Sequence, residues 1–109
     1  MTLWLASAGR AAKNRVVARH FQSRNGKVSR EIERKFPPDL IVISAGFDSR
    51  RGDPLGGLML EDSDFAEMTK EVLRIAEKHS RGRVVGLLEG GYNLDLLGGS
   101  VKSHVSALL

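Results

Sequence analysis

The chain has 109 residues, the length of one domain or of part of one, and a chain of this size buries only a modest core. It contains no cysteine, which excludes a disulfide framework and a thiolate metal site. Its composition is typical of a globular protein, and no apolar run approaches the roughly 20 residues of a membrane span, so we expect no membrane association.

The net charge of +4 is unevenly distributed along the chain. Residues 1–30 hold seven basic residues and no acidic one, whereas residues 31–109 hold ten basic and 13 acidic residues, a net charge of −3. We interpret residues 1–30 as a basic, poorly ordered head and residues 31–109 as the folded part. Such a head also fits a targeting segment or a nucleic-acid-binding arm. It lacks the interleaved aromatic residues of the latter, so nucleic acid is not the expected partner. We expect a cytoplasmic protein, although the head leaves organelle targeting open.

The first half of the chain predicts two short helical segments and one strand. Residues 14–21 could form a helical turn or two. Val28, Ile32 and Phe36 recur at a spacing of four, which predicts a short helix that the following prolines end. The aliphatic run Leu40–Ile43 does not alternate with polar residues and is typical of a strand buried on both faces.

The second half predicts a long loop, a helix, a second strand and a last helix. The Gly-, Asp- and Pro-rich residues 45–62 form the loop, and long loops in compact domains are often functional. A helix is expected from about Ser63 to His79, with a stop at Gly82. Residues 84–88 predict a second buried strand, and apolar residues at helical spacing then run from Leu94 to Leu108.

This order, strand–helix–strand–helix, predicts an α/β fold with an open parallel sheet. The carboxyl ends of parallel strands meet at one edge of such a sheet, and ligands bind there. Asp48 lies four positions after Ser44, which ends the first run, and Tyr92 lies four positions after Leu88. We therefore predict that both side chains face one cleft at this edge.

Both residues carry groups that can do chemistry, and each has a simpler structural interpretation. The Asp48 carboxylate can bind a divalent cation or orient a histidine, but aspartates also often stabilise turns. Tyr92, the only tyrosine, can donate a hydrogen bond to a developing oxyanion, or pack with its hydroxyl at the surface. Asp53, in a Gly-Asp-Pro turn, is expected to be structural. The three histidines stand apart from one another and are expected to be structural or solvated; they are His20, His79 and His104.

Three segments occur in an order that resembles a known family. They are Ser44-Ala-Gly-Phe-Asp48, Gly52-Asp-Pro-Leu-Gly-Gly57 and Glu89-Gly-Gly-Tyr-Asn-Leu94. In this order they resemble the C-terminal part of the zinc-dependent deacetylases, which include histone deacetylases, acetylpolyamine amidohydrolases and acetoin-utilisation proteins. The resemblance covers about residues 31–109 and implies an arginase/deacetylase-like fold.

The resemblance also implies roles for individual residues. Asp48 matches one of three zinc ligands, and Tyr92 matches the tyrosine that polarises the substrate carbonyl together with the metal. Leu55 matches a residue that lines the tunnel for the acylated chain. Gly90 and Gly91 match glycines that give clearance beside the tyrosine. The implied cofactor is Zn²⁺, and the implied substrate is an acetylated amide such as acetyl-lysine or acetylpolyamine.

The chain departs from the family before Ser44. The family's Asp-x-His zinc ligands and its pair of proton-transferring histidines have no counterpart there, and Ser49-Arg50-Arg51 stands where many relatives have a small residue and His. One carboxylate does not hold zinc tightly, because catalytic sites use about three protein ligands. We therefore interpret the chain as an incomplete C-terminal segment of a deacetylase that is inactive alone. The alternative is an inactive remnant or interaction module of the same fold. The expected partners are the substrate and either a missing N-terminal half or a second copy of the chain.

If residues 1 to about 26 are loosely attached, their backbone amides should exchange with solvent faster than those of Leu40–Ile43 and Val84–Leu88. The head has no acidic residues to pair with its basic ones, and it has no sustained apolar stripe. Hydrogen exchange followed by NMR tests this, and strong protection of the head would contradict it.

Overall fold

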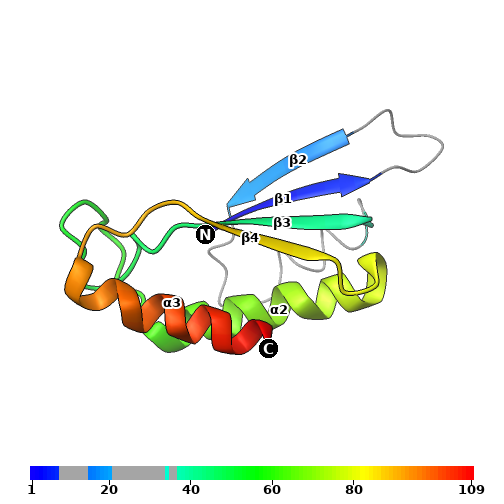
Figure 1. Cartoon of the computed structure of the whole chain (residues 1–109). Coiled ribbons are helices and arrows are strands. Elements are labelled where there is room, and N and C mark those ends of the chain that lie inside the picture. The colour runs from blue at the N-terminus through cyan, green and yellow to red at the C-terminus, as the bar shows by residue number, and fades with distance from the viewer. Residues whose placement is uncertain (8–14, 21–33, 35–36) are drawn as a thin grey trace.

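The computed structural model describes residues 1–7, 15–20, 34 and 37–109. These residues form a four-stranded sheet with two helices on one of its faces (Figure 1). The strands are β1 (Thr2–Ser7), β2 (Arg15–His20), β3 (Leu40–Ala45) and β4 (Val84–Leu88), and the helices are α2 (Asp62–Ser80) and α3 (Leu94–Leu108). Among the described residues, no helix is both long enough and apolar enough to cross a membrane.

The sheet has the strand order β2-β1-β3-β4. The two strands predicted from apolar runs, β3 and β4, are parallel neighbours, with Ile41 opposite Val84 and Ala45 opposite Leu88. The connection between them passes through α2, a crossover helix of the kind that parallel strands need. The predicted α/β class, the helix before β4 and the helix after it are confirmed.

The head differs from the helical turn expected at residues 14–21, because residues 15–20 form β2. This strand pairs antiparallel with β1, and β1 pairs antiparallel with β3. Extended structure suits the β-branched Val16 and Val17. The helix predicted from Val28 to Phe36 lies outside the described residues except for Arg34 and cannot be compared. Loose attachment of the head stays a prediction. The pairing of β1 on both sides favours the opposite outcome for Thr2–Ser7, protected amides, and the same exchange measurement decides between the two.

Helix α2 begins and ends at residues with recognisable capping geometry. The Glu61 N–H donates to Asp64 Oδ2 over 2.8 Å, and together the two residues form a capping box. The helix therefore starts at Asp62, one residue before the expected start at about Ser63. At the other end Arg81 adopts a left-handed conformation with φ of 53°, and the Gly82 N–H donates to the Ala76 carbonyl.

The core lies between the sheet and the helices. Ile41, Ile43 and Ala45 point to the helix side of β3 and pack with residues of α2 and the loop after β3. The buried apolar residues are Met1, Ile41, Ile43, Ala45, Phe47, Phe65, Val72, Ile75 and Ala76. The rings of Phe47 and Phe65 meet with centroids 5.0 Å apart, which ties the loop after β3 to α2.

Strand β4 is exposed, so the prediction that it is a buried strand is wrong for this chain. The side chains of Val85, Leu87 and Leu88 are 46%, 53% and 63% exposed. The physical reason is the position of β4 at the edge of the described sheet, with helices on one face only (Figure 1). An apolar strand in such a position is a surface that further chain would normally cover.

Helices α2 and α3 are joined by one buried polar contact. Thr69 Oγ1 donates to the Phe65 carbonyl over 2.7 Å and lies 2.7 Å from His104 Nδ1. Since the Thr69 hydroxyl has a single proton, Nδ1 of His104 carries a proton and donates it to Thr69. Burial lowers the pKa of His104 below its ordinary value, so the ring is neutral in the folded chain. The expectation of a structural histidine agrees with this position.

The free energy of unfolding should fall as the pH drops below about 6.5. In that range the unfolded chain protonates residue 104, whereas the folded chain, with its lowered His104 pKa, does not. The variant His104→Asn keeps a donor near the Nδ1 position and cannot titrate, so its unfolding should depend less on pH between 7 and 5.5. Urea unfolding at several pH values measures this, and parallel pH profiles for the two proteins would contradict it.

Candidate active site at the carboxyl ends of β3 and β4

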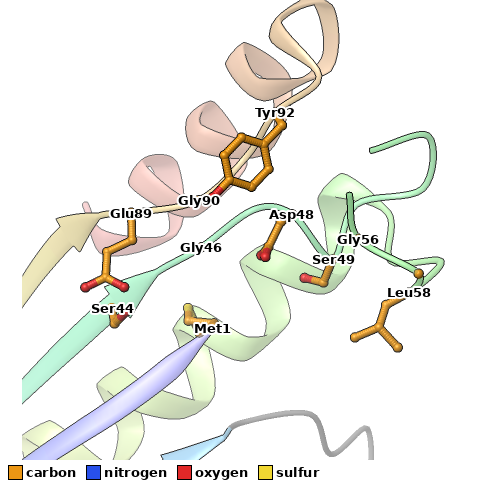
Figure 2. A pocket seen from close by; sticks show the side chains of 11 residues that line it. Met1, Ser44, Gly46, Asp48, Ser49, Gly56, Leu58, Glu89, Gly90 and Tyr92 are labelled. Atoms are coloured by element: carbon orange, nitrogen blue, oxygen red, sulfur yellow. The ribbon is translucent and has the colours of Figure 1, made fainter. Parts of the chain in front are cut away.

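A cavity of about 390 Å³ opens where β3 and β4 end. Its walls come from the ends of both strands, from the loops that follow them and from the first residue of the chain (Figure 2). The lining residues are Met1, Ser44, Gly46, Asp48, Ser49, Gly56, Gly57, Leu58, Glu89, Gly90 and Tyr92. Asp48 and Tyr92 are both among them, which confirms the prediction that they face one cleft.

The two loops stay paired beyond the strands. The Glu89 N–H donates to the Ala45 carbonyl over 3.2 Å, and the Phe47 N–H donates to the Gly90 carbonyl over 2.7 Å. The parallel pairing of β3 and β4 therefore continues up to the residue before Asp48. This continuation places Asp48 against the Glu89-Gly90-Gly91 turn, although about 40 residues separate them in sequence.

Two glycines leave room for the Asp48 carboxylate because they have no Cβ. A Cβ built on Gly46 would lie 3.2 Å from Asp48 Oδ1, and one on Gly90 would lie 3.3 Å from Asp48 Cγ. Both contacts are tighter than ordinary van der Waals packing. Gly90 therefore gives clearance to the carboxylate of Asp48.

The backbone of Asp48 is held from the other side by Gly56. A Cβ on Gly56 would come within 1.4 Å of the Asp48 carbonyl oxygen, so only glycine fits there. Leu55, the preceding residue, is 74% exposed and is not part of the cavity wall, which Leu58 lines instead. The role of Leu55 in substrate binding stays a prediction.

Tyr92 reaches the cavity from the second loop. Its side chain is 53% exposed, and its ring lies over the cavity beside Gly90 (Figure 2). Gly91, directly before it, has φ of +136°, a conformation that L-residues rarely adopt, and a Cβ there would meet Leu97 at 2.6 Å. Gly91 thus shapes the turn on the side that faces Leu97 of α3, and it does not line the cavity with Gly90 and Tyr92.

The Asp53 carboxylate accepts hydrogen bonds from both loops. Oδ1 accepts from the N–H groups of Leu55 and Gly56 at 2.9 and 3.0 Å. Oδ2 accepts from those of Tyr92 and Asn93 at 2.7 and 3.3 Å. Desolvation alone would raise the pKa of Asp53, but the four N–H donors outweigh it and hold the pKa below its ordinary value. The Gly-Asp-Pro motif predicted only a turn, and no sequence signal indicated the contact with Tyr92.

A second polar cluster anchors the base of the first loop. Arg50 forms ion pairs with Glu61 and Asp62, both at 2.9 Å, and only 15% of its side chain is exposed. Ser100 on α3 donates to Asp62 Oδ1 over 2.7 Å. This hydrogen bond from Ser100 is the largest cause of the lowered pKa of Asp62, and Arg50 adds to it. Arg50, a departure from the family's pattern in the sequence, therefore ties the loop to the start of α2, and Asp62 links α2 to α3.

The described residues do not by themselves fit a zinc site. No group of three or more His, Cys, Asp or Glu side chains comes together among them. Of the acidic residues that the structure describes, only Asp48 and Glu89 line the cavity, and the His104 ring is already bonded to Thr69. A catalytic zinc ion takes about three protein ligands, so Asp48 would be one member of a larger set.

Comparison with known proteins identifies the family of the chain. Residues 11–108 match the family model described as the histone deacetylase domain. The chain belongs to the histone deacetylase family. This confirms the resemblance drawn from the three sequence segments.

Individual relatives agree with the family match. The chain is 41% identical over 73 residues to Type-2 histone deacetylase 1 of Dictyostelium discoideum, covering 67% of this chain and 5% of that protein. It is also 41% identical over 75 residues to the chloroplastic histone deacetylase 14 of Arabidopsis thaliana, covering 69% of this chain and 18% of that protein. The chain thus spans less than a fifth of either relative.

A solved structure is also similar to the chain and is much longer than it. The crystal structure of the HDA15 HD domain superposes with a TM-score of 0.62 and 36% identity, over 74% of this chain and 22% of that one. The fold is therefore part of the arginase/deacetylase fold, as the resemblance implied.

The variant Gly56→Ala should lower the free energy of unfolding by about 1–3 kcal/mol and displace Asp48, because the new methyl group overlaps the Asp48 carbonyl. Gly57→Ala is the matched control, since a Cβ at Gly57 meets nothing within 4 Å. Urea unfolding measures the stability, and the amide resonances of residues 46–49 report the displacement. Equal behaviour of the two variants would contradict the packing described here.

Proposed function

We propose that the chain forms one wall of the active site of a zinc-dependent deacetylase, an enzyme that hydrolyses an acetyl-amide such as acetyl-lysine or acetylpolyamine. The observation that carries the proposal is the meeting of Asp48 and Tyr92 on one cavity, at the carboxyl ends of two neighbouring parallel strands. Membership of the histone deacetylase family supports the reaction class.

Tyr92 supplies the part of this chemistry that the chain holds by itself. Its phenol can donate a hydrogen bond to the oxygen of the scissile amide as negative charge develops there. Such a bond counts most in a site without bulk water. Tyr92 is half exposed in this chain, so a further wall over the cavity would strengthen its effect.

Asp48 supplies one of the two carboxylates on the cavity wall, and Glu89 supplies the other. Zinc dependence and the place of Asp48 in the ligand set are part of this proposal and rest on the family's pattern. The described residues offer too few ligands for the ion, so the remaining ones would come from another segment or another chain. The exposed edge and face of β4 are where such a partner would complete the sheet, either as a missing N-terminal half or as a second copy.

A second candidate function is an inactive remnant or interaction module of the same fold. The exposure of Val85, Leu87 and Leu88 on β4 favours it, because a strand of this composition is a surface for association. Recovery of deacetylase activity on adding a separately produced N-terminal segment would favour the enzyme, whereas association without activity would favour the module. The proposed location is the cytoplasm, with organelle targeting through the basic head as the alternative.

The purified chain alone should bind zinc weakly and should not deacetylate an acetyl-lysine peptide, because it offers one cavity carboxylate of the expected set. Zinc stoichiometry after dialysis and a fluorogenic acetyl-lysine assay measure both properties. Stoichiometric zinc together with turnover that Asp48→Ala abolishes would show that copies of this chain assemble a full site.

In a complete deacetylase domain that includes this segment, Tyr92→Phe should leave bound zinc unchanged and lower kcat by about 100-fold or more, since it removes one oxyanion donor. Asp48→Ala should instead abolish zinc retention, because it removes a ligand. Metal analysis beside steady-state kinetics separates the two. Loss of zinc in Tyr92→Phe, or full activity in that variant, would contradict the assigned roles.

A further inference from the structure

One carboxylate outside the cavity wall joins the two loops that build the cavity. The side chain of Asp53 accepts four backbone N–H groups, two from its own loop and two from the loop that carries Tyr92. Asp53 is 9% exposed, so these contacts are largely shielded from water. Hydrogen bonds to an ionised, partly buried acceptor are among the stronger ones in proteins.

Only half of this arrangement is needed to make a turn. The bonds from Oδ1 to Leu55 and Gly56 are local, and aspartates before proline commonly form them. The bonds from Oδ2 reach Tyr92 and Asn93, which lie 39 and 40 residues further along the chain. Formation of the Gly-Asp-Pro turn does not require this second pair, so it has to be explained by the contact between the loops.

The second loop needs such an anchor. Gly91 holds the backbone at φ of +136° directly before Tyr92, and a glycine loses more conformational freedom than any other residue when its backbone is fixed. The Asn93 side chain adds a parallel tie, because its Nδ2 donates to the Gly52 carbonyl over 2.8 Å. The 2.7 Å bond to Asp53 is the contact that holds the backbone of Tyr92 itself.

We propose that Asp53 is the positioning residue of this site: its single carboxylate sets the loop of Leu55 and Gly56 against the loop of Tyr92. Gly56 in turn packs on the Asp48 carbonyl, so the same carboxylate controls the spacing between Asp48 and Tyr92. The consequence for catalysis rests on the proposed deacetylase function, whereas the coupling of the two loops does not.

The chemistry of the side chain makes the proposal testable with a nearly isosteric change. Each carboxylate oxygen can accept two N–H groups, but the amide of asparagine has one accepting oxygen and an NH₂ group that only donates. In Asp53→Asn, whichever way the amide points, one of the two loops faces a donor and loses its acceptor. Asp95→Asn is the matched control, because it removes an exposed carboxylate in the first turn of α3.

Hydrogen exchange on the full chain is the first measurement. In Asp53→Asn the amides of Tyr92 and Asn93, or those of Leu55 and Gly56, should exchange about tenfold faster or more. Exchange in Ile43 and Val72 should not change, and the control should match the unmodified chain. Unchanged exchange at all four amides in Asp53→Asn would overturn the proposal.

Tyr92 provides a second, spectroscopic readout because it is the only tyrosine. Incorporated 3-fluorotyrosine gives one fluorine resonance, which Asp53→Asn should move toward its position in the urea-unfolded chain while Ile43 and Val72 stay protected. The control should leave it in place. A resonance that does not move although the Tyr92 and Asn93 amides exchange faster would show that Asp53 stabilises its own turn without positioning the Tyr92 side chain. These readouts involve no activity, so they can fail or succeed independently of the deacetylase proposal.

If Asp53→Asn unfolds the whole chain, the unmodified protein still decides the question. The amide shifts of Leu55, Gly56, Tyr92 and Asn93 should then follow one common pH midpoint, because one carboxylate serves all four. Two different midpoints, one for each loop, would overturn the proposal.

Discussion

The parallel pairing of β3 with β4 is the constraint on which the rest of this structure depends. Parallel strands need a crossover, and here α2 provides it and covers one face of the pair. The pairing continues into the loops through the bond from the Phe47 N–H to the Gly90 carbonyl. Two loops that are remote in sequence therefore share one edge, and the cavity is the space between them.

Backbone N–H groups and carboxylates then define the shape of that space. Asp53 connects the two loops, and Asp62 with Arg50 and Ser100 connects the first loop to both helices. These contacts lie around the cavity, while Asp48 and Tyr92 point at it. The division is physically sensible, because a reactive group is held best when its backbone is fixed by residues that take no part in the chemistry.

The described residues form one wall of the proposed site. The chain belongs to the histone deacetylase family and spans 22% of the matched HDA15 HD domain chain. The exposure of β4 is a feature of packing, and the absence of a three-ligand cluster among the described residues is a feature of chemistry. Both agree with the proposal that another segment or another chain completes the site.

The sequence alone determined the elements from Leu40 onward and the residues that meet at the cavity. The run Leu40–Ile43, the helical spacing after Asp62 and the run Val84–Leu88 are local patterns, and local patterns report secondary structure directly. The position of Asp48 and Tyr92 beyond two parallel strands then followed from topology alone. The family segments added their expected roles.

Only the tertiary structure decided what surrounds these residues. Residues 15–20 form a strand because they pair with the edge of β1, and this pairing outweighs their weak local helix propensity. Strand β4 is exposed because burial depends on what covers a strand, and composition cannot state which neighbours are present. The sequence predicted Asp53 as a turn residue because the Gly-Asp-Pro motif marks its local hydrogen bonds. Its bonds to Tyr92 and Asn93 depend on two loops that meet in space, and no local pattern encodes that contact.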